Sequence, residues 1–85
     1  MDSFNGLWTD LNGTKITVEE SDNKISITYD NGRGPFHGYE VDETPNGPLA
    51  APVIDVNFTD DRPGTGVLAR GGAAIYWDNG TQWMR

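Results

Sequence analysis

Asparagine–glycine pairs and other glycine-containing turns interrupt this chain at short intervals, and this spacing leaves no room for long helices. Asn-Gly supplies the positive φ angles that two-residue β-hairpin turns require. Between the turns, apolar and polar residues alternate with a period of two, which is typical of half-buried strands. The turn signals are Asn12-Gly13, Asn31-Gly32, Asn46-Gly47, Gly71-Gly72 and Asn79-Gly80.

The clearest strands lie in the first third of the chain and are expected to form a hairpin. Residues 15–19 and 24–30 both alternate apolar with polar side chains, and the polar segment 21–23 lies between them as a turn. One row of side chains from this hairpin is therefore expected to face the interior. The members of that row are Ile16, Val18, Ile25, Ile27 and Tyr29.

Alternation in the rest of the chain predicts further short strands. The segment 42–52 is the exception, because it contains three prolines that cannot donate to a regular ladder, and it is expected to be the longest irregular segment. Strands are expected over residues 54–58, 74–77 and 81–85, with weaker signals over 6–10, 36–41 and 66–70.

Hairpins that follow one another in sequence favour an up-and-down meander, and closing the meander into a barrel hides its edge strands. The 85 residues are enough for one domain that folds alone. The sequence therefore predicts a single all-β domain over residues 1–85. It is expected to be a small antiparallel up-and-down barrel or curled meander of six to eight short strands, with a two-sheet sandwich as the alternative.

Acidic residues outnumber basic residues by thirteen to six, which gives a formal net charge of −7. Phosphate contacts dominate nucleic-acid affinity, so this charge argues against a nucleic-acid partner. It equally disfavours anionic membrane surfaces, and no apolar run approaches the length of a membrane span. The acidic surface indicates either a solubilising role or docking to a basic protein partner.

Cysteine is missing from the sequence, which excludes a disulfide framework and a thiolate zinc site. The first five residues, Met-Asp-Ser-Phe-Asn, contain neither a basic region nor an apolar stretch, so no signal peptide is expected. These two features favour a cytoplasmic location.

His37 is the only histidine and the first candidate for catalysis. A lone histidine without cysteines or other histidines nearby is more typical of a surface or strand position than of a general base or metal ligand. Adjacent carboxylates such as Asp60 and Asp61 point apart on an extended chain and rarely form a catalytic dyad, and we expect one of them to pair with Arg62. The sequence therefore favours a protein without catalytic residues or a cofactor. An enzyme that uses His37 with an acidic neighbour is the third hypothesis.

Aromatic residues supply the strongest signal for a ligand. Trp77 and Trp83 are expected on neighbouring strands, with Tyr76 on the opposite face from Trp77. Core packing explains tryptophans in so small a domain, but aromatic faces flanked by polar groups also hold sugars and small planar molecules. We expect such a ligand at a barrel mouth. The expected binding residues are Arg33, His37, Tyr39, Asp61 and Tyr76.

Gly6-Leu7-Trp8 near the N-terminus and Trp83-Met84-Arg85 near the C-terminus together resemble the calycins, the group of lipocalins and avidins. In those families a Gly-x-Trp on the first strand packs beside an Arg or Lys from the last strand and closes one end of the barrel. An indole face and a guanidinium group attract each other by a cation–π interaction. The resemblance implies that Trp8 and Arg85 have this closing role.

These observations predict a non-enzymatic binding module for a small molecule or a carbohydrate. The alternative function is an acidic protein-interaction domain that docks a basic partner. Small barrels also pair through exposed sheet faces, so a homodimer fits the sequence as well as a monomer does.

Overall fold

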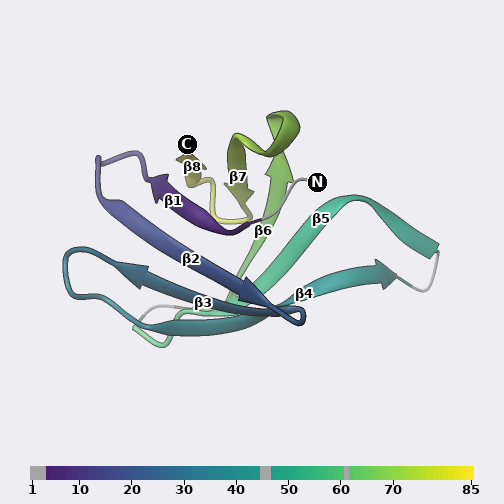
Figure 1. Ribbon diagram of the computed structural model, residues 1–85, viewed down its shortest axis with the longest axis horizontal. Coiled ribbons are helices and arrows are strands. Elements are labelled where there is room, and N and C mark those ends of the chain that lie inside the picture. The colour runs from purple at the N-terminus through teal and green to yellow at the C-terminus, as the bar shows by residue number, and fades with distance from the viewer. Residues whose placement is uncertain (1–3, 45–46, 61) are drawn as a thin grey trace.

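Antiparallel strands make up most of the chain (Figure 1). The computed structural model describes residues 4–44, 47–60 and 62–85, with side chains outside 42–50. A short 3-10 turn, η1 (Arg70–Gly72), follows the sixth strand, and no helix within these ranges is long and apolar enough to cross a membrane. The strands are β1 (Gly6–Thr9), β2 (Lys15–Ser21), β3 (Lys24–Tyr29), β4 (Phe36–Thr44), β5 (Gly47–Asn57), β6 (Gly64–Ala69), β7 (Ala74–Trp77) and β8 (Gln82–Met84).

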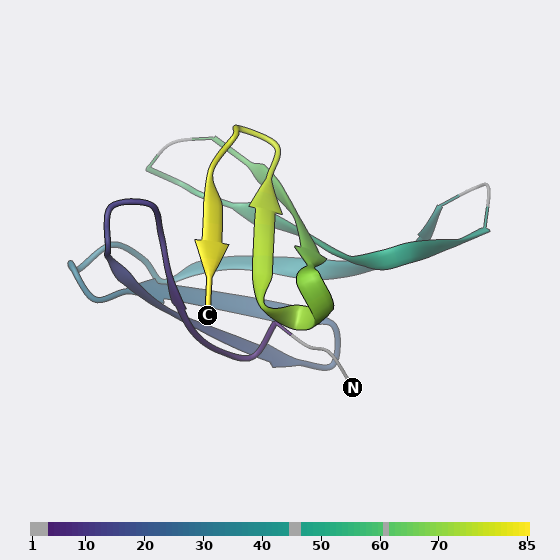
Figure 2. The same ribbon diagram turned by 90° about the horizontal axis from the view of Figure 1, so that it is seen from above.

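Each strand pairs antiparallel with the next, and β8 returns to β1, so the strands form a closed up-and-down barrel (Figure 2). The all-β barrel predicted from the sequence is therefore confirmed. The closing ladder is short, because β1 and β8 share a single residue pair, Thr9 with Met84. Closure leaves neither β1 nor β8 as an exposed sheet edge.

The β2–β3 hairpin shows how local sequence sets the register of the barrel. Ser21 pairs with Lys24, which leaves Asp22 and Asn23 as a two-residue turn. Their φ angles are +53° and +65°, as a type I′ turn requires, and Asp and Asn tolerate these angles better than other residues with a side chain. With this register the inward row predicted from the sequence is buried.

One apolar core fills the middle of the barrel. Burial of each large aliphatic or aromatic side chain contributes about 1.5–3 kcal/mol. Truncation of a fully buried member, such as Ile27→Ala, therefore costs about 2–5 kcal/mol. The core consists of Phe4, Trp8, Ile16, Val18, Ile25, Ile27, Tyr29, Phe36, Ile54, Val56, Leu68, Ile75, Trp77 and Trp83.

The expectation of an irregular segment over 42–52 is wrong, because β4 continues to Thr44 and β5 begins at Gly47. The register between these strands shifts between Val41 and Glu43. Beyond this irregularity the two strands leave the barrel as a projecting two-stranded ribbon (Figures 1 and 2). Each strand of such a ribbon has a free edge, where the missing N–H of a proline is tolerated.

Two glycines permit close packing within the barrel wall. A Cβ atom on Gly38 would clash with the carbonyl oxygen of Asp55 on the neighbouring strand. A Cβ atom on Gly66 would lie 2.9 Å from Cγ2 of Ile75 and 3.1 Å from the benzo edge of Trp77. Glycine at position 66 therefore makes room for the indole of Trp77 inside the barrel.

The up-and-down topology separates the loops into two groups. The β1–β2, β3–β4, β5–β6 and β7–β8 connections lie together at one end of the barrel, which we call the mouth. The opposite end, which we call the closed end, contains the segment before β1, the β2–β3 turn and η1. Any functional difference between the two ends depends on what closes each of them.

Candidate functional site

The closed end is sealed by side chains from both ends of the chain. Phe4 is fully buried, and its carbonyl oxygen accepts a hydrogen bond from Nε1 of Trp8 at 2.9 Å. The guanidinium carbon of Arg85 lies 4.1 Å from the ring centroid of Trp8. Arg85 also donates from Nε to the carbonyl of Gly72 at 2.7 Å and from Nη1 to the carbonyl of Asn5 at 2.6 Å. These contacts leave the mouth as the end at which a ligand could enter.

Five aromatic side chains form a continuous ring beneath the mouth, which we call the aromatic layer. Going around it, ring centroids are 5.9 Å apart for Tyr29 and Phe36, 5.2 Å for Phe36 and Phe58, and 5.3 Å for Phe58 and Trp77. Trp77 and Trp83 follow at 4.7 Å, and Trp83 and Tyr29 complete the ring at 5.9 Å. Most of these contacts are edge-to-face, which is a favourable geometry for aromatic pairs.

A pocket of about 200 Å³ opens above the aromatic layer. Tyr29, Phe58, Trp77 and Trp83 supply its apolar lining, while side chains from the mouth loops supply polar groups. An apolar base with a few convergent polar groups is the usual composition of a small-ligand site. The polar lining residues are Asp10, Asn12, Arg33, Arg62, Asp78, Asn79 and Thr81.

Side-chain to backbone hydrogen bonds fix the conformations of the mouth loops. Oδ1 of Asp10 accepts from the backbone N–H groups of Asn12 at 2.8 Å and Thr14 at 2.9 Å. Oδ1 of Asn79 accepts from the backbone N–H of Thr81 at 2.9 Å. Such Asx-type bonds order a turn locally, so the rim of the pocket is formed before any ligand arrives.

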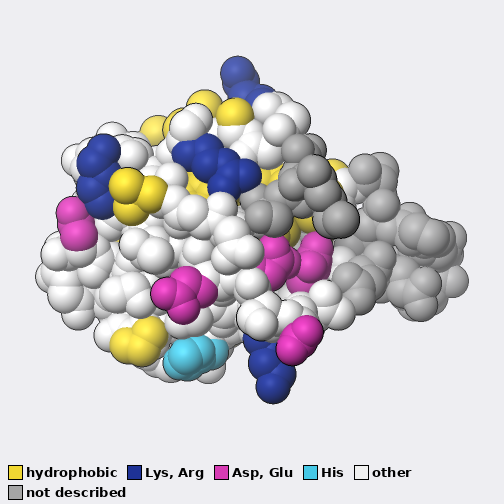
Figure 3. Space-filling view, viewed as in Figure 1, with side chains coloured by type: hydrophobic (Ala, Val, Ile, Leu, Met, Phe, Trp, Pro, Cys, Tyr) yellow, Lys and Arg dark blue, Asp and Glu magenta, His cyan; other side chains and the backbone are white. Residues whose placement is uncertain are grey.

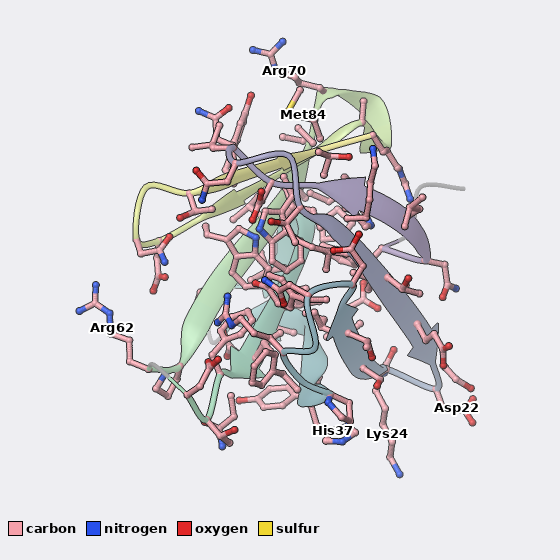
Figure 4. The ribbon with its side chains drawn as sticks, turned by 90° about the vertical axis from the view of Figure 1, so that its left-hand side faces the viewer. Asp22, Lys24, His37, Arg62, Arg70 and Met84 are labelled. Atoms are coloured by element: carbon pink, nitrogen blue, oxygen red, sulfur yellow. The ribbon has the colours of Figure 1, made fainter. Side chains whose placement is uncertain are left out.

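Arg33 ties two mouth loops together. It donates from Nε to Oδ2 of Asp60 at 2.7 Å and from Nη2 to Oδ1 at 3.0 Å, a bidentate ion pair. Its guanidinium carbon also lies 4.4 Å from the ring centroid of Tyr29. Asp60 therefore does not pair with Arg62, which projects away from the barrel (Figure 4), and Asp61, the other carboxylate expected to pair with Arg62, lies outside the described residues.

Electrostatics at the mouth follow from these contacts. The hydrogen bond from Arg33 lowers the pKa of Asp60, and the same bond raises the pKa of Arg33. Burial raises the pKa of Tyr29, because the ionised phenolate would lose hydration inside the barrel, and the nearby positive charge of Arg33 partly opposes this shift. Tyr29 is therefore neutral well beyond the physiological pH range.

Trp77, which lines the pocket, carries a buried hydrogen-bond donor that is unused. Its side chain is 6% exposed, and its Nε1 atom is buried without a partner among the described residues. The benzo edge of the indole packs toward Gly64 and Gly66, so the pyrrole edge that bears Nε1 lies on the side away from β6. A buried donor without a partner costs about 1–3 kcal/mol, and such groups in native proteins call for a functional or structural explanation.

The structure does not bring the five binding residues predicted from the sequence into one site. Arg33 lies at the mouth pocket, whereas His37 and Tyr39 line an open depression on the outer surface of β4 and β5. Tyr76 lies on the outside of β7, where its hydroxyl accepts a hydrogen bond from Arg70. Asp61 lies outside the described residues. The prediction that Tyr76 and Trp77 occupy opposite faces agrees with their burial.

Sequence reasoning missed most of the mouth. Tyr29 and Trp77 are the last residues of their strands, and Asp10 and Asp78 each directly follow a strand that runs toward this end. In an up-and-down meander, every second loop lies at the same end of the barrel. The order of the strands in the sequence would therefore have placed these residues together at one end. The same reasoning applies to Phe58, which directly follows β5, another strand that runs toward this end.

No group of three or more His, Cys, Asp or Glu side chains that could hold a metal ion occurs among the residues with described placement. Comparison of the chain with protein-family models, with curated proteins and with solved structures finds no match.

Proposed function

We propose that this protein is a non-enzymatic binding module that takes a small molecule or a sugar into the mouth of its barrel. The observation that carries the proposal is the contrast between the two ends. Arg85 and Phe4 close one end, while the other end has a pocket with an aromatic base and a rim of ordered polar loops. Ligand sites in small barrels are commonly found in the mouth.

The size of the pocket limits the ligand. Drug-sized sites measure about 300–1,000 Å³, so the pocket of about 200 Å³ fits one sugar ring or one planar ring. The aromatic layer offers apolar contact to either ring type. Asp78 can accept a hydrogen bond from a hydroxyl or amine of the ligand at the rim.

The resemblance to the calycins supports the same orientation. In that arrangement the Trp and Arg pair belongs to the end away from the ligand, and Trp8 and Arg85 stack at the closed end here. The predicted residues His37, Tyr39 and Tyr76 have no part in this proposal, because they lie on the outer surface.

Nuclear magnetic resonance of the three indole N–H groups tests the proposal. Trp77 and Trp83 line the mouth pocket, whereas Trp8 lies at the closed end and serves as an internal control. The probes are glucose and galactose as neutral sugars, with phenol, benzamidine and benzoate as neutral, cationic and anionic single rings, each up to about 10 mM. We expect at least one probe to shift the Trp77 and Trp83 signals without moving Trp8.

Two matched variants locate the binding site. Thr81→Phe places a ring in the pocket and is expected to abolish the shifts, whereas His37→Ala on the outer surface is expected to leave them unchanged. The proposal is overturned if no probe moves the Trp77 and Trp83 signals. It is equally overturned if the probes shift only residues of the outer surface around His37 and Tyr39.

A second candidate function, docking of a basic protein partner, is supported by the distribution of aspartates. Asp10, Asp30, Asp60 and Asp78 place at least one carboxylate on each of the four mouth loops, although Asp60 is already paired with Arg33. An oligolysine peptide distinguishes the two functions. Docking predicts shifts of the backbone amides of the mouth loops that disappear at about 0.5 M salt, with the indole signals unchanged.

A further inference from the structure

Half of the barrel wall contains no charged residue. The strands β6, β7, β8 and β1 are consecutive in the barrel, and none of their residues is Asp, Glu, Lys or Arg. Each of the other four strands contains at least one charged residue. We call the first group the uncharged wall. In a chain with thirteen acidic residues, this segregation of charge needs a physical reason.

Apolar side chains are exposed on the outside of the uncharged wall. Val67 is 36% exposed, Met84 38% and Leu7 57%. Val67 pairs with Tyr76 on the neighbouring strand, so the outward side chains of adjacent strands are contiguous. In the space-filling view, hydrophobic side chains gather along the upper edge of the molecule (Figure 3). Exposed apolar surface depleted of charge is characteristic of the central part of a protein–protein interface.

Opposite charges flank this apolar surface. Arg70 begins η1 at the closed end of the wall, and its Nε donates to the hydroxyl of Tyr76. Asp78 follows β7 directly and lies at the mouth end, where it also lines the pocket. Figure 2 looks onto this wall, with η1 at one end of β7 and the β7–β8 turn at the other. Figure 4 shows Arg70 and Met84 projecting from the same surface.

We propose that the uncharged wall is the interface of a two-fold symmetric homodimer. A two-fold axis near Tyr76, about midway along β7, exchanges the two ends of the strand. It therefore brings Arg70 of each copy opposite Asp78 of the other, with Met84 and Val67 in the apolar centre. A surface that is complementary to itself under a two-fold rotation is what an isologous dimer requires.

A second copy of this chain is the occupant that the charges favour. Two molecules that each carry −7 repel one another, and the repulsion is smallest where carboxylates are missing from the contact surface. Arg70 of each copy then pairs with Asp78 of the other, which adds two attractive charge pairs at the edges of the contact. The apolar centre of this contact lies on the outside of the barrel, whereas Asp78 at its edge also lines the mouth pocket.

Sedimentation velocity from about 1 μM to about 1 mM protein tests for the dimer, with each variant first checked for its native circular dichroism. We expect wild type to move from monomer to dimer across this range. Met84→Lys places a charge in the apolar centre and is expected to give a monomer at all concentrations. His37→Lys, on the opposite outer surface (Figure 4), is the matched control and is expected to associate like wild type.

A charge exchange tests the pairing itself. Arg70→Asp and Asp78→Arg are each expected to weaken the dimer by about tenfold or more, and the double variant is expected to recover the wild-type affinity. Aspartate suits position 70, whose φ angle is +55°. Arg62→Asp makes the same charge change on a mouth loop and is expected to have little effect on association.

Three outcomes overturn the proposal. Wild type that stays monomeric up to the highest concentration excludes the dimer. A dimer that Met84→Lys does not weaken uses another surface. A dimer that each single charge reversal weakens, but that the double variant fails to recover, excludes the pairing of Arg70 with Asp78 across the two-fold axis.

Discussion

The guanidinium group of Arg85 stacks on the indole of Trp8 at 4.1 Å, and this contact joins the last strand of the barrel to the first. The strands themselves are joined by the single pair of Thr9 with Met84. Arg85 therefore compensates for a short ladder, because it also binds the carbonyl groups of Gly72 and Asn5. One side chain thus links β8, η1, β1 and the segment before β1.

Removal of this side chain is expected to destabilise the protein without disturbing the mouth. Arg85→Ala loses the stacking contact and two charge-assisted hydrogen bonds, which together correspond to about 2 kcal/mol in the free energy of unfolding. Arg85→Lys keeps the charge but not the planar donor geometry, so we expect only partial recovery. Urea denaturation measures both variants, with the exposed Arg62→Ala as control. An Arg85→Ala protein as stable as wild type would show that the ladder alone closes the barrel.

Gly66→Ala is expected to displace the indole of Trp77 in the aromatic layer, although Gly66 itself does not line the pocket. The added Cβ meets Ile75 and the benzo edge of Trp77, both of which are held by the core. Overpacking of this kind costs about 1–3 kcal/mol. We expect a lower urea midpoint and a changed near-ultraviolet circular dichroism signal from Trp77. Val67→Ala, one residue away on the outer face, is expected to leave that signal unchanged.

Stability is expected to fall at alkaline pH because of Tyr29. Its pKa is raised in the folded protein, so above about pH 10 the unfolded chain releases the phenolic proton while the folded protein still holds it. The stabilising contribution is therefore complete below pH 10 and is lost as the pH rises toward the folded pKa. Tyr29→Phe is expected to flatten this dependence in urea titrations between pH 9 and 11. The exposed Tyr39→Phe is expected to retain the wild-type slope.

Asp10→Ala is expected to loosen the first mouth loop selectively. The carboxylate of Asp10 accepts the backbone N–H groups of Asn12 and Thr14, and both lose this partner in the variant. Hydrogen exchange of the Thr14 amide is expected to accelerate by about tenfold or more, while the amides of β3 keep their protection. Equal acceleration throughout the barrel would instead indicate a global loss of stability.

The fold follows from the sequence mainly through local rules. Asp22 and Asn23 specify a tight turn, and alternation then decides which side chains of β2 and β3 face the core. The same rules place His37 and Tyr39 on the outside, because they alternate with the buried Phe36. The sequence therefore held evidence against both residues as members of a site inside the mouth.

The site itself depends on contacts between segments that are distant in the chain. The aromatic layer takes its members from the ends of several strands, and Arg33 finds Asp60 on another loop rather than a neighbour in sequence. Local patterns do not specify such partners, because closure of the barrel decides them. The error over residues 42–52 has a different origin, since prolines are tolerated in a ribbon that has left the barrel.

A ribosome releases β1 before all the other strands, yet β1 gains its second neighbour only when β8 emerges. During that interval the nascent sheet presents open edges, which can recruit strands from other chains. The strands that flank the gap, β1 and β7, contain no charged residue, so no side-chain charge on them repels a strand from another chain. The time between the synthesis of β1 and the arrival of β8 is therefore the period in which this protein is most exposed to aggregation.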